Sequence, residues 1–248
     1  MKAKRIVTIG LDGILHRTYI KRKPVDLVII NTPRVFLYRK DYQIAKRVMD
    51  IALCLLTMPL TLPLLAICAL AIRIDSPGPV VFVQERIGKG GRRFRMYKFR
   101  TMQHNLDDSC HRTFMKAFVN GRIADNENGG AIYKPVQASQ VTRVGRILRK
   151  TSLDELPQLI NVLRGEMSLV GPRPNVPWEF EEYRSWHNER LEVMPGITGL
   201  AQVRGRSGIT FDSIVKYDIE YIEKKSLAMD LKILWWTVVS VLFGTGAQ

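Results

Sequence analysis

The chain has 248 residues, with 38 Lys or Arg against 23 Asp or Glu, which gives a formal net charge of +15 at neutral pH. That length allows one sizeable domain or two small ones. The charge favours an anionic partner, such as nucleic acid, anionic lipid or a phosphorylated substrate. The three cysteines, at positions 54, 68 and 110, do not have the spacing of metal ligands, and they indicate a reducing compartment. We also expect no secretory signal, because the N-terminus lacks a continuous apolar core.

Residues 1–45 are predicted to form an N-terminal extension, to which the sequence assigns no role. Two short apolar runs, at 5–10 and 25–30, read as strands separated by a basic stretch.

An uncharged, apolar segment covers residues 51–72. About 20 such residues suffice for a helix to cross the roughly 30 Å hydrocarbon core of a bilayer. Both flanks are basic, and basic flanks favour the cytoplasmic side. Pro59 and Pro63 lie near the middle and remove backbone donors there. These features predict a re-entrant hairpin over 46–75. A straight span is the alternative, since proline is tolerated in membrane helices.

A pair of strands is predicted at 80–83 and 94–100, joined by a glycine-rich turn. The two-residue period of a strand places Lys98 and Arg100 on one face. Two cations that project together suit a diphosphate. They are equally compatible with a solvated strand face.

Two further segments carry structural predictions. Residues 103–140 are polar and are predicted to form a mobile insertion. Residues 231–243 are apolar, with Trp235 and Trp236, but are too short to span a bilayer. An interfacial helix is predicted there, and a core helix is the alternative.

The strongest candidate site is the stretch Thr151-Ser-Leu-Asp-Glu-Leu-Pro-Gln158. Pro157 is best tolerated in a first helical turn, which places Asp154 and Glu155 beside a helix N-terminus. An ionised Asp beside a metal is a competent nucleophile on phosphorus. The alternative is structural: Asp154 is an N-cap, or Ser152 and Glu155 form a capping box.

Basic residues surround this stretch in the sequence. Arg143, Arg146, Arg149 and Lys150 precede it and form either a phosphate clamp or a solvated face that contacts anionic lipid.

Two segments that follow it are also basic. Arg173 lies between two prolines, so its guanidinium has little conformational freedom to lose. The glycine-rich stretch 195–208 contains Arg204 and Arg206 and suits close approach to a nucleotide.

Taken together, these motifs resemble those of the bacterial sugar transferases, the monotopic phosphoglycosyl transferases that act on a polyprenyl phosphate. The resemblance covers the chain from about Lys46 to its C-terminus. The motifs, in family order, are Lys46-Arg-Val-Met-Asp50, Gly78-Pro-Val80, Gln84-Glu-Arg-Ile-Gly88, Lys98-Phe-Arg-Thr-Met102, Thr142-Arg-Val-Gly-Arg146, Ser152-Leu-Asp-Glu-Leu-Pro-Gln-Leu159, Gly171-Pro-Arg-Pro174 and Pro195-Gly-Ile-Thr-Gly199.

The resemblance implies an α+β fold: a mainly helical, compact cytoplasmic domain over 76–248, with a small β-hairpin or sheet, anchored by a re-entrant membrane helix-break-helix. The break would rest on Thr57, Pro59 and Pro63, because this chain has Met58 before Pro59 where the family often has Ser-Pro. The chain also departs from the family near Ala201, where other members often have an aromatic residue.

The resemblance also implies the reaction. The enzyme would transfer a sugar 1-phosphate from a UDP-sugar to undecaprenyl phosphate on the cytoplasmic face of the bacterial inner membrane, with release of UMP. This is the first membrane step of exopolysaccharide, capsule, O-antigen or glycoprotein glycan synthesis. Asp154 would attack the β-phosphorus and form a covalent phospho-sugar intermediate. Glu155 would act as base or Mg²⁺ ligand, with Asp154 as the other metal ligand.

The implied phosphate-binding residues are Lys98, Arg100, Arg146, Arg149, Arg173, Arg204 and Arg206. The expected partners are the UDP-sugar, undecaprenyl phosphate and anionic membrane lipid, without nucleic acid. A homodimer and downstream glycosyltransferases are further candidate partners.

Two rival functions stay open at this point. A metal-dependent glycosyltransferase would move the sugar alone and release UDP. A basic scaffold at the membrane surface would have no activity and would tolerate substitution of Asp154.

Overall fold

The computed structural model describes residues 5–9, 15–19, 40–104, 109–121, 140–205 and 209–243. The chain divides into two compact units, Met1–Gln43 and Ile44–Gln248. In the first unit, β1 (Arg5–Ile9) and β2 (Leu15–Tyr19) pair antiparallel. β1 agrees with the strand predicted at 5–10, while the run at 25–30 lies outside the described residues.

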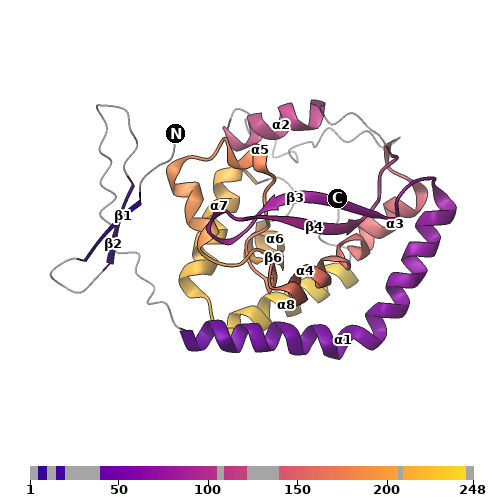
Figure 1. The fold of residues 1–248 in the computed structure, drawn as a ribbon, viewed down its shortest axis with the longest axis horizontal. Coiled ribbons are helices and arrows are strands. Elements are labelled where there is room, and N and C mark those ends of the chain that lie inside the picture. Colours follow the sequence, from indigo (N-terminus) through magenta and orange to yellow (C-terminus); the bar gives the residue numbers. More distant parts are fainter. Residues whose placement is uncertain are drawn as a thin grey trace. The chain divides into compact units, whose positions relative to one another are not determined.

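Helix α1 (Lys40–Asp75) is continuous through Pro59 and Pro63. Figure 1 shows that the helix bends along its length. Proline has no N–H and its ring clashes with the preceding turn, which is an ordinary cause of a bend. The Thr57 hydroxyl also donates to the Leu53 carbonyl at 2.9 Å. The described structure therefore has a bent helix where the sequence predicted a break.

Most apolar side chains on the outer side of α1 are exposed in the described structure. It is long and apolar enough to cross a membrane by length and composition, and 11% of its most apolar stretch is buried. Its exposed apolar side chains include Leu55, Leu56, Leu60, Leu62, Ile67 and Leu70.

The N-terminal part of α1 is fixed to the second unit by charged side chains. The Lys46 ammonium lies 3.1 Å from a carboxylate oxygen of Asp230, which is fully buried on α8 (Leu227–Leu242). Arg47 donates to the carbonyls of Val162 and Leu163 in the last turn of α4 (Gln158–Arg164).

The C-terminal part of α1 is fixed to the same unit. Asp75 accepts a hydrogen bond from the Val144 N–H, at the start of α3 (Arg143–Thr151). Cys68 and Ile72 pack in a buried cluster with Phe99 and Leu148. Both ends of the apolar helix are thus attached to one folded unit.

The predicted strand pair is confirmed. β3 (Val81–Ile87) and β4 (Arg93–Phe99) are antiparallel, with Phe82 opposite Lys98. The connection contains Gly90 at φ 66°, a left-handed conformation that glycine adopts without steric cost. β4 ends at Phe99, one residue earlier than predicted.

A second, parallel pair lies closer to the core. It consists of β5 (Ser168–Val170) and β6 (Gly196–Thr198). The backbones approach so closely that a Cβ on Gly196 would lie 2.1 Å from the Gly171 nitrogen. Only glycine fits at this position.

Helices cover these strands (Figure 1). The main buried cluster joins β5 to α6 (Leu200–Gly205), α7 (Phe211–Lys224) and α8. Shorter helical segments, α5 (Pro177–Phe180) and η4 (Ser185–Glu192), follow β5. The predicted mainly helical fold with a small β part is confirmed.

The predicted insertion at 103–140 contains α2 (Ser109–Val119). Val119 is fully buried and packs with Phe211 and Val215 of α7. Residues 122–139 lie outside the described residues, so the mobility of the insertion stays a prediction, as do the domain limits drawn at 45 and 75.

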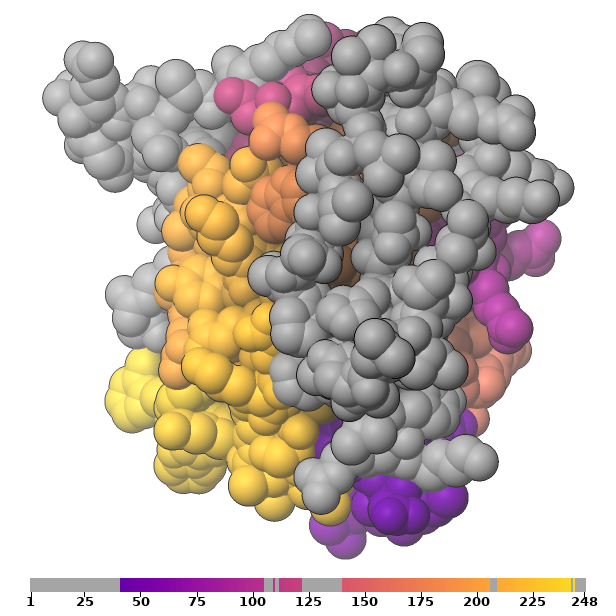
Figure 2. All heavy atoms as spheres, turned by 90° about the vertical axis from the view of Figure 1, so that its left-hand side faces the viewer, coloured from indigo at the N-terminus to yellow at the C-terminus, as the bar shows by residue number. Residues whose placement is uncertain are grey.

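Helix α8 has an inner and an outer side. Ile233 is fully buried, whereas Leu231, Trp235, Val238 and Val241 are exposed. Figure 2 shows the C-terminal helices, coloured orange to yellow, forming one side of the surface. The interfacial position of this helix stays a prediction.

Replacing Asp230 by Asn is expected to lower the free energy of unfolding by about 3 kcal/mol, because the mostly buried Lys46 ammonium loses its nearer carboxylate, at 3.1 Å, and keeps only Asp50 at 3.9 Å. Thermal and urea unfolding followed by circular dichroism in detergent would measure the change. Glu220→Gln is the matched control, since Glu220 forms a more exposed ion pair with Lys224 at 3.0 Å. That change should stay below about 1 kcal/mol. Equal losses in the two variants would contradict the buried attachment of α1.

Candidate functional site

The two predicted catalytic carboxylates lie on η3 (Leu153–Glu155), a single 3₁₀ turn between α3 and α4. Ser152 precedes it at φ 56° and is the non-glycine residue with positive φ in the described part of the chain. Its side chain makes no capping hydrogen bond, and the N-cap of α4 is Pro157. The structural alternative, in which Asp154 or a Ser152–Glu155 box caps the helix, is therefore wrong.

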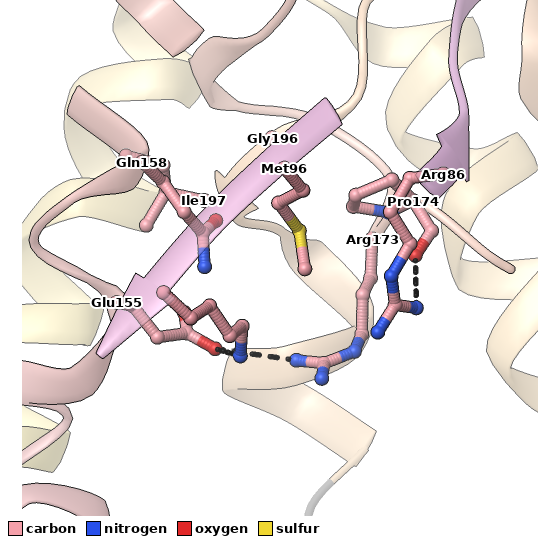
Figure 3. Close-up of a pocket in the computed structure, with 9 residues that line it drawn as sticks. Arg86, Met96, Glu155, Gln158, Arg173, Pro174, Gly196 and Ile197 are labelled. Carbon is pink, nitrogen blue, oxygen red and sulfur yellow. Dashed lines mark hydrogen bonds and ion pairs between the residues drawn. The ribbon is translucent and has the colours of Figure 1, made fainter. Parts of the chain in front are cut away.

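Two cations from distant segments meet Glu155. The Lys98 ammonium, on β4, lies 2.7 Å from Oε1 of Glu155 and 3.9 Å from Oδ2 of Asp154. Arg173, in the segment between β5 and α5, places Nη1 at 3.5 Å from the same Glu155 oxygen. Figure 3 shows Glu155 and Arg173 turned toward one another across the lower side of a small pocket. The chain thus brings three sequence-predicted residues to Asp154.

Burial and charge shift these groups in different directions. Burial raises the pKa of Asp154, and the neighbouring Glu155 charge adds to that rise against the opposing cations. Burial alone would raise the pKa of Glu155, but Lys98 and Arg173 outweigh it and hold that pKa below its usual range. Burial also lowers the pKa of Lys98. Glu155 is therefore the carboxylate held as an anion by direct contacts, while Asp154 is the one less stabilised as an anion.

Arg149 is the next nearest predicted residue. Its Nε donates to the Thr101 hydroxyl at 2.9 Å, and its charge acts to lower the pKa of Asp154. Arg146 lies on the same helix, α3, but its side chain is exposed. Of the four basic residues before the carboxylates, Arg149 is half-buried, whereas Arg143, Arg146 and Lys150 are exposed.

The pocket is small and partly open to solvent. The residues that line it are Arg86, Met96, Lys98, Glu155, Gln158, Arg173, Pro174, Gly196 and Ile197.

The structure places two other predicted residues elsewhere, and a third is not described. Arg100 is 5% exposed and donates to the Ser76 and Pro77 carbonyls, which follow α1. Arg204 forms an ion pair with Glu220 at 3.2 Å and lies over the ring of Trp236. Arg206 lies outside the described residues.

Sequence reasoning missed two residues of this pocket. Arg86 donates to the Pro174 carbonyl, and burial lowers its pKa to about 10. Gln158 is 2% exposed. Both belong to the motifs that carried the resemblance, so their place in those motifs was the available indication.

Mg²⁺ was predicted at Asp154 and Glu155. No group of three or more His, Cys, Asp or Glu side chains in the described segments could hold a metal ion. Mg²⁺ is commonly bound by one or two carboxylates together with substrate phosphates. Glu155 Oε1 already contacts Lys98, whereas Asp154 Oδ2 is 3.9 Å from that ammonium. The residues fit the ion if a phosphate shares its coordination.

Comparison with known proteins finds one family over most of the chain. A family model described as bacterial sugar transferase matches residues 41–244. A UDP-glucose:undecaprenyl-phosphate glucose-1-phosphate transferase of Caulobacter vibrioides is 42% identical, over 90% of this chain and 81% of that protein.

Two further relatives are longer than this chain. The galactosyl transferase CpsE of Streptococcus agalactiae is 41% identical, over 85% of this chain and 45% of that protein. A UDP-glucose:undecaprenyl-phosphate glucose-1-phosphate transferase of Escherichia coli is 40% identical, over 91% and 46%. The chain therefore spans less than half the length of these two curated relatives.

Replacing Lys98 by Met is expected to raise the pKa of both Asp154 and Glu155, because the Lys98 charge lowers each of them. Carboxyl ¹³C NMR titration of the labelled protein would follow the two groups. Lys116→Met is the control, since Lys116 pairs with Glu182 at 3.4 Å, outside the pocket. Unchanged titration of Glu155 in the Lys98 variant would refute the electrostatic coupling.

Proposed function

This chain belongs to the bacterial sugar transferase family, and we propose on that premise that it transfers a sugar 1-phosphate from a UDP-sugar to undecaprenyl phosphate, with release of UMP. Relatives from Caulobacter vibrioides and Escherichia coli carry names that state this reaction for glucose 1-phosphate. The observation that carries the proposal is the position of Asp154. It is a partly buried carboxylate with a raised pKa, next to a pocket lined by cations.

In the proposed first half-reaction, an Asp154 carboxylate oxygen attacks the β-phosphorus, which bears the sugar. A bond forms between that oxygen and phosphorus, the bond from phosphorus to the bridging oxygen breaks, and UMP leaves with the electron pair. Lys98 and Arg173 lie where they would neutralise charge that develops on the phosphate oxygens. Glu155 holds both cations in place through its Oε1.

In the second half-reaction, an oxygen of undecaprenyl phosphate attacks the same phosphorus. The bond to Asp154 breaks, and the carboxylate is restored. Mg²⁺, held by Asp154 and Glu155 together with the substrate phosphates, would supply further neutralisation of negative charge.

Membrane attachment by a re-entrant α1 is part of the proposal. Basic residues flank the helix on both sides, and both of its ends contact one folded unit through Lys46 and Asp75. A single folded unit lies on one side of a bilayer, so these attachments favour entry and exit by the same face. The positive-inside rule makes that face the cytoplasmic one. The outer side of α8 would then lie in the same interface.

Asp154→Asn is the direct test of the mechanism. Asn keeps the size and polarity of the side chain but lacks the attacking charge, so activity should fall by several orders of magnitude with folding unchanged. Release of UMP from a panel of UDP-sugars, with undecaprenyl phosphate as acceptor, measures the rate. Without acceptor, wild-type protein given labelled UDP-sugar should retain label after denaturation, and the variant should not.

Glu85→Gln is the matched control, because Glu85 is a half-exposed carboxylate in a surface pair with Arg93. It should keep wild-type turnover. Release of UDP in place of UMP would identify the sugar-only transferase. Turnover of Asp154→Asn within tenfold of wild type would refute the covalent mechanism.

The topology has a separate test. In a background where the three native cysteines are replaced by Ser, single cysteines at Asp41 and at Glu85 should react with an impermeant maleimide from the cytoplasmic side only. Both positions are exposed and lie on opposite sides of the apolar stretch. Labelling of the two cysteines from opposite sides would show a straight span.

A further inference from the structure

Gln158 lines the pocket, and among the described residues its amide nitrogen has no hydrogen-bond partner. It is the first residue of α4 and is 2% exposed. Within the described segments, its Nε2 is fully buried and has no acceptor. Figure 3 shows the amide projecting into the pocket on the Glu155 side, with Met96 between it and Arg86.

Such a donor is unfavourable in a folded protein unless something accepts its hydrogen bond. The other end of the pocket shows the same feature, because Arg86 Nε is also buried without an acceptor. Two donors of one pocket therefore lack an acceptor in the described part of the chain. An acceptor from outside the chain would satisfy them.

The charge around Gln158 indicates what that acceptor is. Lys98, Arg86 and Arg173 line the same pocket, and Glu155 is the carboxylate among the lining residues. Its Oε1 is already engaged by Lys98 and Arg173. An anion with several acceptor oxygens matches this excess of donors and positive charge.

We propose that Gln158 is a substrate-binding residue whose Nε2 donates a hydrogen bond to a phosphate oxygen of the nucleoside diphosphate. The inference rests on the proposed function and deepens it, because it assigns a neutral donor to a phosphate that the cations hold by charge. The amide is neutral and its N–H donates along a defined direction, so it sets the orientation of the phosphate relative to Asp154.

The test compares the affinities of UDP and uridine for the full-length protein in detergent, measured by competition against a fluorescent uridine nucleotide. Gln158→Met keeps the length of the side chain and removes the donor. It should lower the ratio of UDP affinity to uridine affinity about tenfold, because uridine has no phosphate. Gln158→Glu should lower the ratio further, since a carboxylate at this place repels phosphate.

Two controls make the result decisive. Gln202→Met should leave the ratio within twofold of wild type, because the Gln202 amide already donates to the Ile197 carbonyl at 3.0 Å. Arg173→Gln should lower the ratio and shows that the assay detects phosphate binding. A ratio unchanged in Gln158→Met beside a fall in Arg173→Gln would overturn the role of Gln158 alone. Failure of wild-type protein to bind UDP would overturn the proposed function with it.

Discussion

The ammonium of Lys46 lies between two almost fully buried carboxylates, Asp50 at 3.9 Å and Asp230 at 3.1 Å, and this contact joins α1 to the rest of the second unit. Asp50 also accepts a hydrogen bond from Ser168 of β5 at 2.7 Å. Buried charged groups therefore connect α1 to both α8 and β5. With Asp75 holding the other end, the apolar middle of α1 is left outside the protein. A bilayer is the environment in which that exposure is favourable.

Buried charges are also paired at the pocket, but the cations that line it outnumber the carboxylates. Glu155 faces two cations, Lys98 and Arg173, and a third, Arg86, lies in the same pocket. An excess of positive charge in a partly buried pocket is unfavourable for the protein alone. The phosphate group of the proposed substrate would compensate that excess.

Sequence reasoning predicted the features that depend on residues close together in the chain. It failed for side chains whose position depends on residues far away in the sequence. The apolar stretch, the strand pair and the placement of Asp154 and Glu155 all follow from local patterns or motif order. Arg100 was predicted to share a face with Lys98, but β4 ends at Phe99 and the Arg100 side chain turns to the residues that follow α1. Gln158 was missed because nothing in a sequence distinguishes a buried amide without a partner from a solvated one.

The close approach of β5 and β6 fixes the backbone beside the pocket. A Cβ on Gly171 would lie 2.3 Å from the Met194 carbonyl oxygen, and one on Gly196 would lie 2.1 Å from the Gly171 nitrogen. The main chain that leads into Arg173 is thus held against the main chain of the pocket wall, with no side chain between them. The position of the backbone beside Arg173 is therefore set by direct contact between two main chains. A larger residue at either glycine would force the two main chains apart and move Arg173 relative to Glu155.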